Sequence, residues 1–195
     1  MKKRRMIIFN DQSINSQAIA CLTVGNHTEK CGVCIILQKI NNEEFESDKI
    51  FENEEAAREE IRQLISQEIL DNKIILIDGW FFFINGVSAF AATPGEKRGH
   101  CTVTLAAVSG EIIQENFAIQ EEADWWLNGV LELFRKEDLI NFDVFYYIKD
   151  RIISIEIDKN SSIIVDLDNT FAAQDFQNQK EAEDEFENLI KEMEK

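Results

Sequence analysis

Residues 117–131, with the sequence FAIQEEADWWLNGVL, are the most informative about the fold, because their pattern of apolar residues recurs twice in the chain. Phe117 and the residues 6, 10, 13 and 14 positions further on are apolar, and the same offsets are apolar in residues 51–65 and 176–190. The copies begin 66 and 59 residues apart. The last four positions fall on one side of a helix. Self-similarity of this kind predicts a chain built from internal repeats.

The shared positions are all typical of a protein core, so the repeat encodes packing and not a binding motif. In the copy quoted above they are Phe117, Ala123, Leu127, Val130 and Leu131. The outer helix faces, in contrast, differ between the copies. They carry Arg58 and Arg62 in the first copy, Trp125 in the second and a run of acidic residues in the third. We therefore look for partner contacts on the faces that differ.

Short runs rich in Val, Ile and Phe flank each predicted helix and indicate strands. Asp78-Gly79 and Asn85-Gly86 are strong signals for two-residue hairpins, which predicts three successive antiparallel strands at 73–77, 80–84 and 87–92. Turns this short cannot make parallel crossovers. We predict an α+β fold with mainly antiparallel sheet, built from about three strand-strand-helix(-strand-strand) repeats with the helices packed on the sheet. The predicted helices are 54–70, with Asn53 as N-cap, 121–136 and 180–194, and a strand is predicted at 142–148.

The two ends of this pattern are incomplete. The third repeat stops at its helix without a trailing pair of strands, while strands predicted at 6–10 and 18–24 have no helix of their own. One hypothesis is that the N-terminal pair lies beside the third repeat and completes it; the alternative is one continuous meander with helices on one face. The loop 93–99 predicts two lobes, 1–95 with the first repeat and 96–195 with the other two, unless the chain is one continuous domain.

The charge of the chain is strongly uneven. Residues 1–40 contain six basic and two acidic residues, whereas residues 41–195 contain 14 and 35, within a net charge of −17. Such a field repels nucleic acid and acidic membranes and attracts basic partners. No segment approaches the ~20 apolar residues of a membrane span. We expect a cytoplasmic protein whose four cysteines are reduced and mostly buried.

From this balance we predict a non-catalytic, acidic protein-binding module that needs no cofactor and is not an enzyme. The most specific version of this prediction is an immunity-type or anti-defence-type inhibitor of a basic or nucleic-acid-handling protein. The sequence is also compatible with self-association into a homo-oligomer. Trp125 falls opposite the apolar arc of its helix and is a candidate anchor; alternatively it covers a strand, with its indole in the notch at Gly129. The acidic candidates, alternatively a solvated helix face, are Glu181, Glu183, Asp184, Glu185 and Glu187.

A second interpretation rests on residues 163–170, with the sequence IIVDLDNT. This stretch resembles the first motif of haloacid-dehalogenase-type phosphatases, in which an apolar strand precedes Asp-x-Asp-x-Thr. The resemblance implies a metal-dependent phosphatase with magnesium, with Asp166 as nucleophile, Asp168 as general acid/base and Thr170 in support. It also implies a parallel strand in a Rossmann-like domain and further motifs downstream, for which 25 residues after Thr170 are too few.

A third interpretation is a zinc-stabilised structural module. Cys31 and Cys34 have the C-x-x-C spacing of a metal site, and His100 and Cys101 supply two further ligands of the right type. A redox pair at the same cysteines would need a helix after the second one, but residues 35–37 read as a strand. The alternative is that these cysteines are core residues at the starts of strands.

Overall fold

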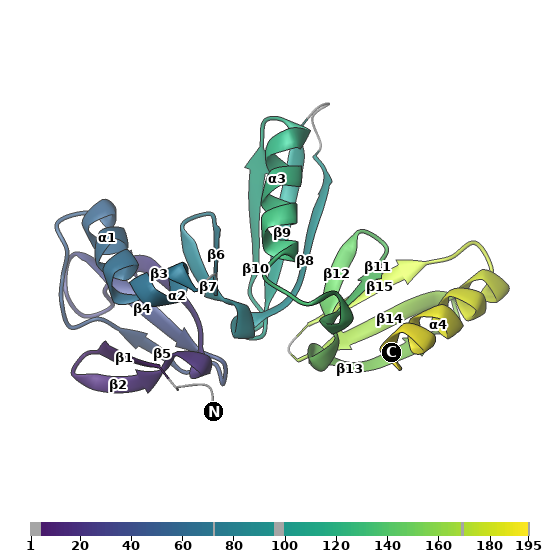
Figure 1. Cartoon of the computed structure of the whole chain (residues 1–195), viewed down its shortest axis with the longest axis horizontal. Helices are drawn as coiled ribbons and strands as arrows, with labels where there is room; N and C mark the ends of the chain where they lie inside the picture. Colours follow the sequence, from purple (N-terminus) through teal and green to yellow (C-terminus); the bar gives the residue numbers. More distant parts are fainter. Residues whose placement is uncertain (1–4, 72, 96–99, 169, 195) are drawn as a thin grey trace. The chain divides into compact units, whose positions relative to one another are not determined.

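The computed structural model describes residues 5–71, 73–95, 100–168 and 170–194, and it divides into two compact units, residues 1–87 and 88–195 (Figure 1). The described residues contain four α-helices and 15 strands in antiparallel sheets, which confirms the predicted α+β class. The loop 93–99, where the sequence predicted a boundary, lies partly outside the described residues. The strands on its two sides, β8 and β9, are neighbours in one sheet.

Unit 1 contains a five-stranded sheet in the order β5-β4-β3-β7-β6 and a separate two-stranded sheet, β1-β2. Helix α1 contacts β3 and β4. A short 3-10 turn, η1, joins β2 to β3. The elements are β1 (Met6–Phe9), β2 (Gln12–Asn15), η1 (Ser16–Ala18), β3 (Ile19–Asn26), β4 (Val33–Lys39), β5 (Glu44–Glu46), α1 (Glu54–Leu64), α2 (Ser66–Leu70), β6 (Ile74–Ile77), β7 (Trp80–Phe83) and η2 (Ile84–Gly86).

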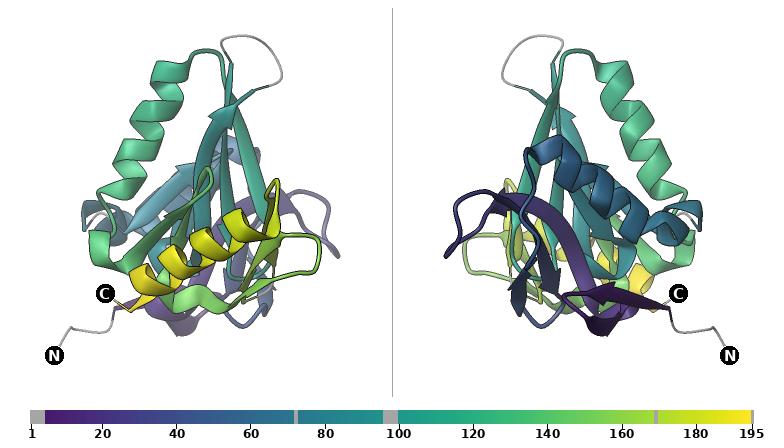
Figure 2. Two further views of the ribbon diagram at one scale, coloured as in Figure 1. Left: turned by 90° about the vertical axis from the view of Figure 1, so that its right-hand side faces the viewer. Right: turned by 90° about the vertical axis from the view of Figure 1, so that its left-hand side faces the viewer.

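Unit 2 contains a five-stranded sheet, β10-β9-β8-β12-β11, and a three-stranded sheet, β13-β14-β15. Helix α3 contacts β9 and β10, and α4 contacts β11, β13 and β14, as the left view of Figure 2 shows for the yellow C-terminal helix. The elements are β8 (Val87–Pro94), β9 (Cys101–Ala107), β10 (Ile112–Phe117), α3 (Gln120–Leu131), η3 (Lys136–Asp138), β11 (Leu139–Phe142), β12 (Phe145–Ile148), η4 (Lys149–Arg151), β13 (Ile152–Ile157), β14 (Ser162–Leu167), β15 (Phe171–Asp175) and α4 (Gln179–Met193).

The same order of elements occurs three times. Each repeat has a hairpin of two four-residue strands, a three-residue 3-10 turn, three further strands and a helix. Repeat 1 begins with β1, repeat 2 with β6 and repeat 3 with β11. Each later hairpin pairs with the sheet of the repeat before it, since β7 pairs with β3 and β12 with β8. Helices α1 and α3 therefore have a pair of strands on each side in sequence, which explains the strand-strand-helix-strand-strand pattern that the sequence predicted.

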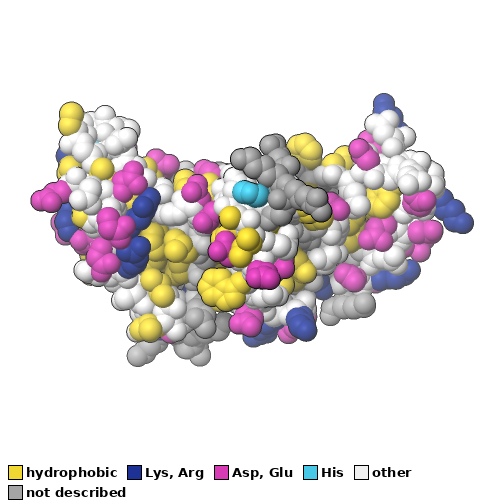
Figure 3. Space-filling model, turned by 90° about the horizontal axis from the view of Figure 1, so that it is seen from above, with side chains coloured by type: hydrophobic (Ala, Val, Ile, Leu, Met, Phe, Trp, Pro, Cys, Tyr) yellow, Lys and Arg dark blue, Asp and Glu magenta, His cyan; other side chains and the backbone are white. Residues whose placement is uncertain are grey.

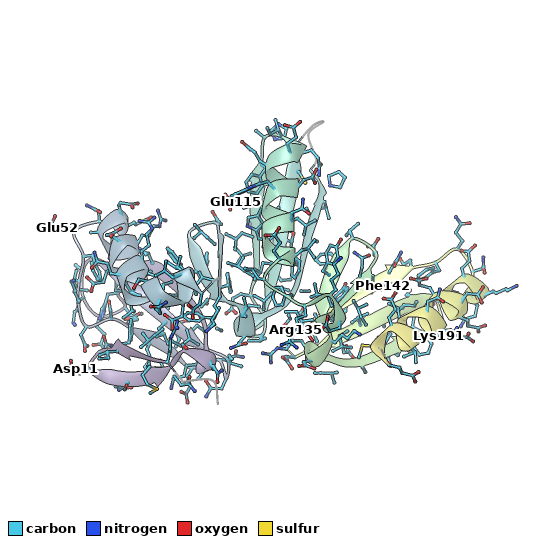
Figure 4. All side chains as sticks on the ribbon, in the orientation of Figure 1. Asp11, Glu52, Glu115, Arg135, Phe142 and Lys191 are labelled. Atoms are coloured by element: carbon cyan, nitrogen blue, oxygen red, sulfur yellow. The ribbon has the colours of Figure 1, made fainter. Side chains whose placement is uncertain are left out.

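Two strands differ from the prediction because their turns lack glycine. The sequence indicated no strand at 12–15, but Asn10 and Asp11 adopt left-handed φ values of 47° and 59° and reverse the chain between β1 and β2. Figure 4 labels Asp11 at this turn. The single strand predicted at 142–148 is likewise a hairpin that turns at Asp143, with φ 54°. Asn and Asp tolerate this backbone region better than other non-glycine residues, so the sequence signal is weak.

The Asn85-Gly86 pair was predicted to form a hairpin, and that prediction is wrong. These residues belong to η2, which leads from β7 in one sheet to β8 in another. Gly86 adopts a negative φ there, and a Cβ on this residue would lie 2.4 Å from the carbonyl oxygen of Ala20. The glycine is therefore required by close approach of two backbones and not by a left-handed turn.

The helices follow the repeated apolar pattern. Asn53 caps α1 as predicted, because its side chain accepts a hydrogen bond from the backbone N–H of Ala56 at 2.9 Å. Ala57 and Ile61 are fully buried on the inner face of α1. The predicted helix 54–70 is interrupted at Ile65, and the predicted helix 121–136 ends at Leu131. The first two predicted helices are therefore shorter than expected, whereas α4 (Gln179–Met193) matches the predicted helix 180–194 to within one residue.

The N-terminal hairpin contributes to the core of unit 1. Ile7, Phe9 and Ile14 are buried in one cluster with residues of β3, β4 and α1. The β11–β12 hairpin occupies the equivalent position in unit 2, where its residues share a core with β14 and α4. The hypothesis that the N-terminal pair adds strands to the third sheet within the chain is therefore wrong: β1 pairs with β2, and the third sheet contains three strands.

Candidate functional site

The outer face of α3 presents the most exposed large hydrophobic side chain among the described residues. Trp125 is 80% exposed, whereas its neighbour Trp126 is buried. Successive residues of an α-helix point about 100° apart, so one indole faces the core and the other faces solvent. Ala123 and Val130 are buried beside Trp126 and fix this rotation of the helix against β9 and β10.

The exposure of Trp125 argues against the alternative that this residue covers a strand of the chain. An indole that covered a strand of the chain would be largely buried, and Trp125 is not. A Cβ added at Gly129, one turn further along α3, would meet no atom within 4 Å, so the indole does not occupy that notch. The notch and the indole are therefore both open on the surface of unit 2.

Three carboxylates precede Trp125 on the same helix, two of them within one turn of it on the helix surface. Glu121, Glu122 and Asp124 are all exposed in the first turns of α3, where the helix dipole favours negative charge. Asp124 accepts a hydrogen bond from the side-chain amide of Gln120 at 2.8 Å. Figure 3 shows hydrophobic side chains lying next to acidic ones on one face of the molecule. We call Trp125, Glu121, Glu122 and Asp124 the α3 patch.

The second set of candidates lies on α4, a different helix. Its inner face is anchored by Ala182 and Leu189, which are buried. The acidic residues predicted as candidates lie on the remaining faces, four of them exposed and one, Glu185, half-buried. They are Glu181, Glu183, Asp184, Glu185 and Glu187. The structure therefore places the acidic run at the surface of α4, as the helix pattern predicted, and apart in sequence from the α3 patch.

The basic residues on the outer face of α1 are engaged by acids of the same helix. Arg58 contacts Glu54 at 2.9 Å, and Arg62 contacts Glu55 at 2.9 Å and Glu59 at 3.4 Å. These surface pairs are worth little stability each. They do, however, neutralise the only helix face on which the sequence indicated positive charge. Helix α1 nevertheless contains four glutamates and two arginines, so it carries net negative charge, as α3 and α4 do.

The cysteine residues do not form a metal site in the described part of the chain, where no three His, Cys, Asp or Glu side chains gather suitably for a metal ion. Cys31 is exposed, while Cys34 and Cys101 are fully buried and His100 is half-buried. The Cys101 thiol donates a hydrogen bond to the Thr93 carbonyl oxygen at 2.9 Å. Burial raises the pKa of the Cys34 and Cys101 thiols, which opposes formation of the thiolate that binds metal.

The second aspartate motif lies in a different context from that of the phosphatases it resembles. Strand β14, which carries Asp166, pairs antiparallel with both β13 and β15. The Asp166 carboxylate accepts a hydrogen bond from the Ser154 hydroxyl at 2.7 Å, and Asp168 lies 3.4 Å from the guanidinium of Arg151. The parallel strand implied by the resemblance is thus replaced by a β-hairpin around these residues.

Comparisons with known proteins add no assignment, since no family model, curated protein or solved structure matches the chain. None of the helices in the described residues has the length and apolar character needed to cross a bilayer.

Sequence reasoning missed a further class of surface residues, namely apolar side chains on unpaired strand edges. Ile153 in β13 is 66% exposed, and the sequence pattern did not single it out. Its exposure depends on which strands flank β13. The local sequence pattern does not determine the order of strands in a sheet. Ile153 is identified when β13 is compared with β3 and β8, the equivalent strands of the other two repeats.

Proposed function

We propose that the chain is a non-catalytic module that binds a basic protein through the α3 patch, with Trp125 as the anchor. The specific form is an inhibitor of immunity or anti-defence type whose partner handles nucleic acid. We place it in the cytoplasm, where its four cysteines, none of which forms a disulfide bond in the structure, stay reduced. The single observation that carries this proposal is an 80% exposed Trp125 with carboxylates on the same helix.

Transfer of the exposed Trp125 indole from water into an interface is favourable in free energy. Burying an aromatic side chain removes about 150–250 Å² from solvent, and at about 25 cal/mol per Å² the exposed part of Trp125 is worth about 3–5 kcal/mol to a partner that covers it. Trp is the residue type most enriched among interface residues whose removal costs more than about 2 kcal/mol. The open notch at Gly129 gives a partner side chain room beside the indole.

The negative charge near Trp125 predicts that the partner surface is positively charged. Glu121, Glu122 and Asp124 add three carboxylates on the same helix, within a chain of net charge −17. Complementary charge raises the association rate and disfavours wrong partners more than it raises affinity. Nucleic-acid-handling proteins carry basic surfaces that match this pattern. An acidic patch with one apolar anchor therefore fits a basic protein surface with an apolar pocket.

The catalytic alternative receives no support from the residues that suggested it. Asp166 and Asp168 are engaged by Ser154 and Arg151 of the same sheet region. Ser154 lies opposite Asp166 in the β13–β14 pairing, and Arg151 and Asp168 lie just beyond the ends of these two strands. We therefore retain binding, and not phosphoryl transfer, as the proposed function.

The test is affinity capture from an extract of the native host with wild type, Trp125→Ala and Phe171→Ala. Phe171 is a matched control, since it is an aromatic residue of similar exposure (68%) on β15. We expect a basic protein on wild type and on Phe171→Ala, with binding weakened about 30-fold or more by Trp125→Ala. Equal binding by all three variants, or no basic protein at about 0.05 M salt, would refute the proposal.

Charge variants then separate the two acidic faces. Neutralising Glu121, Glu122 and Asp124 to their amides should lower the association rate and its salt dependence with the purified partner. Neutralising Glu183 and Asp184 on α4 should leave both unchanged. The opposite result would assign the interface to α4 and overturn the role of the α3 patch.

A further inference from the structure

The chain pairs consecutive repeats in the same way twice. In unit 1 the β7 strand of repeat 2 pairs antiparallel with β3 of repeat 1, with Leu22 opposite Phe81. In unit 2 the β12 strand of repeat 3 pairs antiparallel with β8 of repeat 2, with Phe90 opposite Tyr146. These two pairs occupy equivalent positions in the repeats, so the register is identical. The hairpin of one repeat is therefore the edge partner of the repeat before it.

In the third repeat the corresponding strand edge has no partner among the described residues. Strand β13 is the equivalent of β3 and β8, and no strand among the described residues pairs with its outer edge. The second residue of each of these strands shows the consequence. Ala20 and Ser88 are fully buried, whereas Ile153 at the same position is 66% exposed. An unpaired edge with an exposed Ile is a site where another strand can add.

The complementary open position lies at the N-terminal end. Strand β2 is the equivalent of β7 and β12, and within the described residues its only sheet partner is β1. Beside β2 lies an open groove of about 650 Å³, lined by all four residues of β2 and by Ala18, Lys39, Ile40 and Asn41. The groove lies along the strand to which, in the later repeats, the sheet of a preceding repeat is attached.

We propose that copies of this chain associate head to tail, with β2 of one copy adding to β13 of the next as an antiparallel pair. The register follows from the two pairs within the chain. Ser13 of one copy lies opposite Ile155 of the next, and Ile14 lies opposite Ser154. Backbone hydrogen bonds supply the affinity in such strand additions. The interface joins two different surfaces, so repeated association builds open chains or closed rings.

The charges at the two ends of the sequence are complementary. Residues 1–18 contain four basic residues and one acidic residue, whereas residues 152–195 contain four basic and 12 acidic residues. Opposite charge steers the two ends together, and added salt weakens that attraction. Gln12 and Ser13 replace the aromatic residues found at these positions in β7 and β12. We therefore expect reversible association that depends on protein concentration.

The first test is the mass of the full chain in solution by sedimentation or light scattering, up to about 1 mM protein. We expect the mass to rise with concentration from the 22.5 kDa of one chain to at least twice that value, and to fall with added salt. A mass of one chain over the whole range overturns the proposal.

Variants of each edge identify the interface. Ser13→Pro blocks an edge strand on the exposed side of β2, and Ile153→Lys places a charge on the open edge of β13. Each variant alone should remain at the mass of one chain. Phe171→Lys, on the opposite edge strand of the same sheet, is the matched control and should associate as wild type does. Circular dichroism verifies that each variant remains folded.

Mixing the two edge variants gives the decisive outcome. A Ser13→Pro chain retains an intact β13, and an Ile153→Lys chain retains an intact β2, so an equimolar mixture has one functional interface per pair. We expect the mixture to reach a mass of two chains and no further. Association of either variant alone, or failure of the mixture to form a dimer, overturns the head-to-tail arrangement.

Discussion

Gly86, the last residue of η2, approaches β3 so closely that even a methyl group does not fit. A Cβ at this position would lie 2.4 Å from the Ala20 carbonyl oxygen and 2.5 Å from the Ala20 Cα. Cβ contacts below 3.0 Å essentially do not occur, so the two backbones would have to separate by at least 0.6 Å. Ala20 is fully buried and lies at an irregularity of β3 between Ile19 and Cys21, where the backbone has little room to move.

The expected cost of Gly86→Ala follows from this geometry. Overpacking of a buried site costs about 1–3 kcal/mol, and the lower entropy of the unfolded alanine chain offsets about 0.4–1 kcal/mol of it. We expect a net loss of about 1–2 kcal/mol in the free energy of unfolding. With a urea dependence of about 1–3 kcal/mol per M, the unfolding midpoint should fall by roughly 0.3–2 M.

The same substitution at Gly129 is the control, because its expected effect has the opposite sign. Gly129 is exposed within α3, and an added Cβ meets no atom within 4 Å. Alanine is favoured over glycine inside a helix by about 0.8–1 kcal/mol, so Gly129→Ala should raise the midpoint. Hydrogen exchange should localise the effect of Gly86→Ala to β3 and β7. A midpoint for Gly86→Ala equal to or above that of wild type would refute the close-approach argument.

Three further predictions test the packing of the helices and the accessibility of the cysteines. Trp125→Ala should change the free energy of unfolding by less than about 0.5 kcal/mol, whereas Trp126→Ala should cost about 3–5 kcal/mol, because only Trp126 is buried; urea unfolding of both variants checks this. Asn53→Ala removes the side chain that caps α1 and should cost about 1 kcal/mol in the same assay, and an unchanged midpoint would contradict the capping role. In a short pulse of iodoacetamide at about pH 8, Cys31 should be alkylated first, because Cys34 and the other two cysteines are buried and burial raises the pKa of the Cys34 thiol; equal labelling of all four by mass spectrometry would contradict the described burial.

The class of the fold and the inner faces of the helices could be predicted from the amino-acid sequence alone. The offsets shared by residues 51–65, 117–131 and 176–190 are set by the helix period, which is a local property. The same period places Trp125 and Trp126 about 100° apart, so the outward direction of Trp125 followed from the chain alone. The cap at Asn53 and the turn at Asp78-Gly79 were equally local, and both were found.

Which strands are neighbours in a sheet became clear only from the tertiary structure. Asn10-Asp11 and Asp143 turn the chain without the glycine that identifies such turns, while Asn85-Gly86 carries the glycine for another reason. Sheet order depends on contacts between residues far apart in sequence, and local propensity does not encode it. For the same reason the exposure of Ile153 is visible only once β13 is seen to lack the hairpin that β3 and β8 each receive. The repeated helix pattern thus specifies how each repeat packs, and the strand pairing between repeats specifies which strand edges remain unpaired.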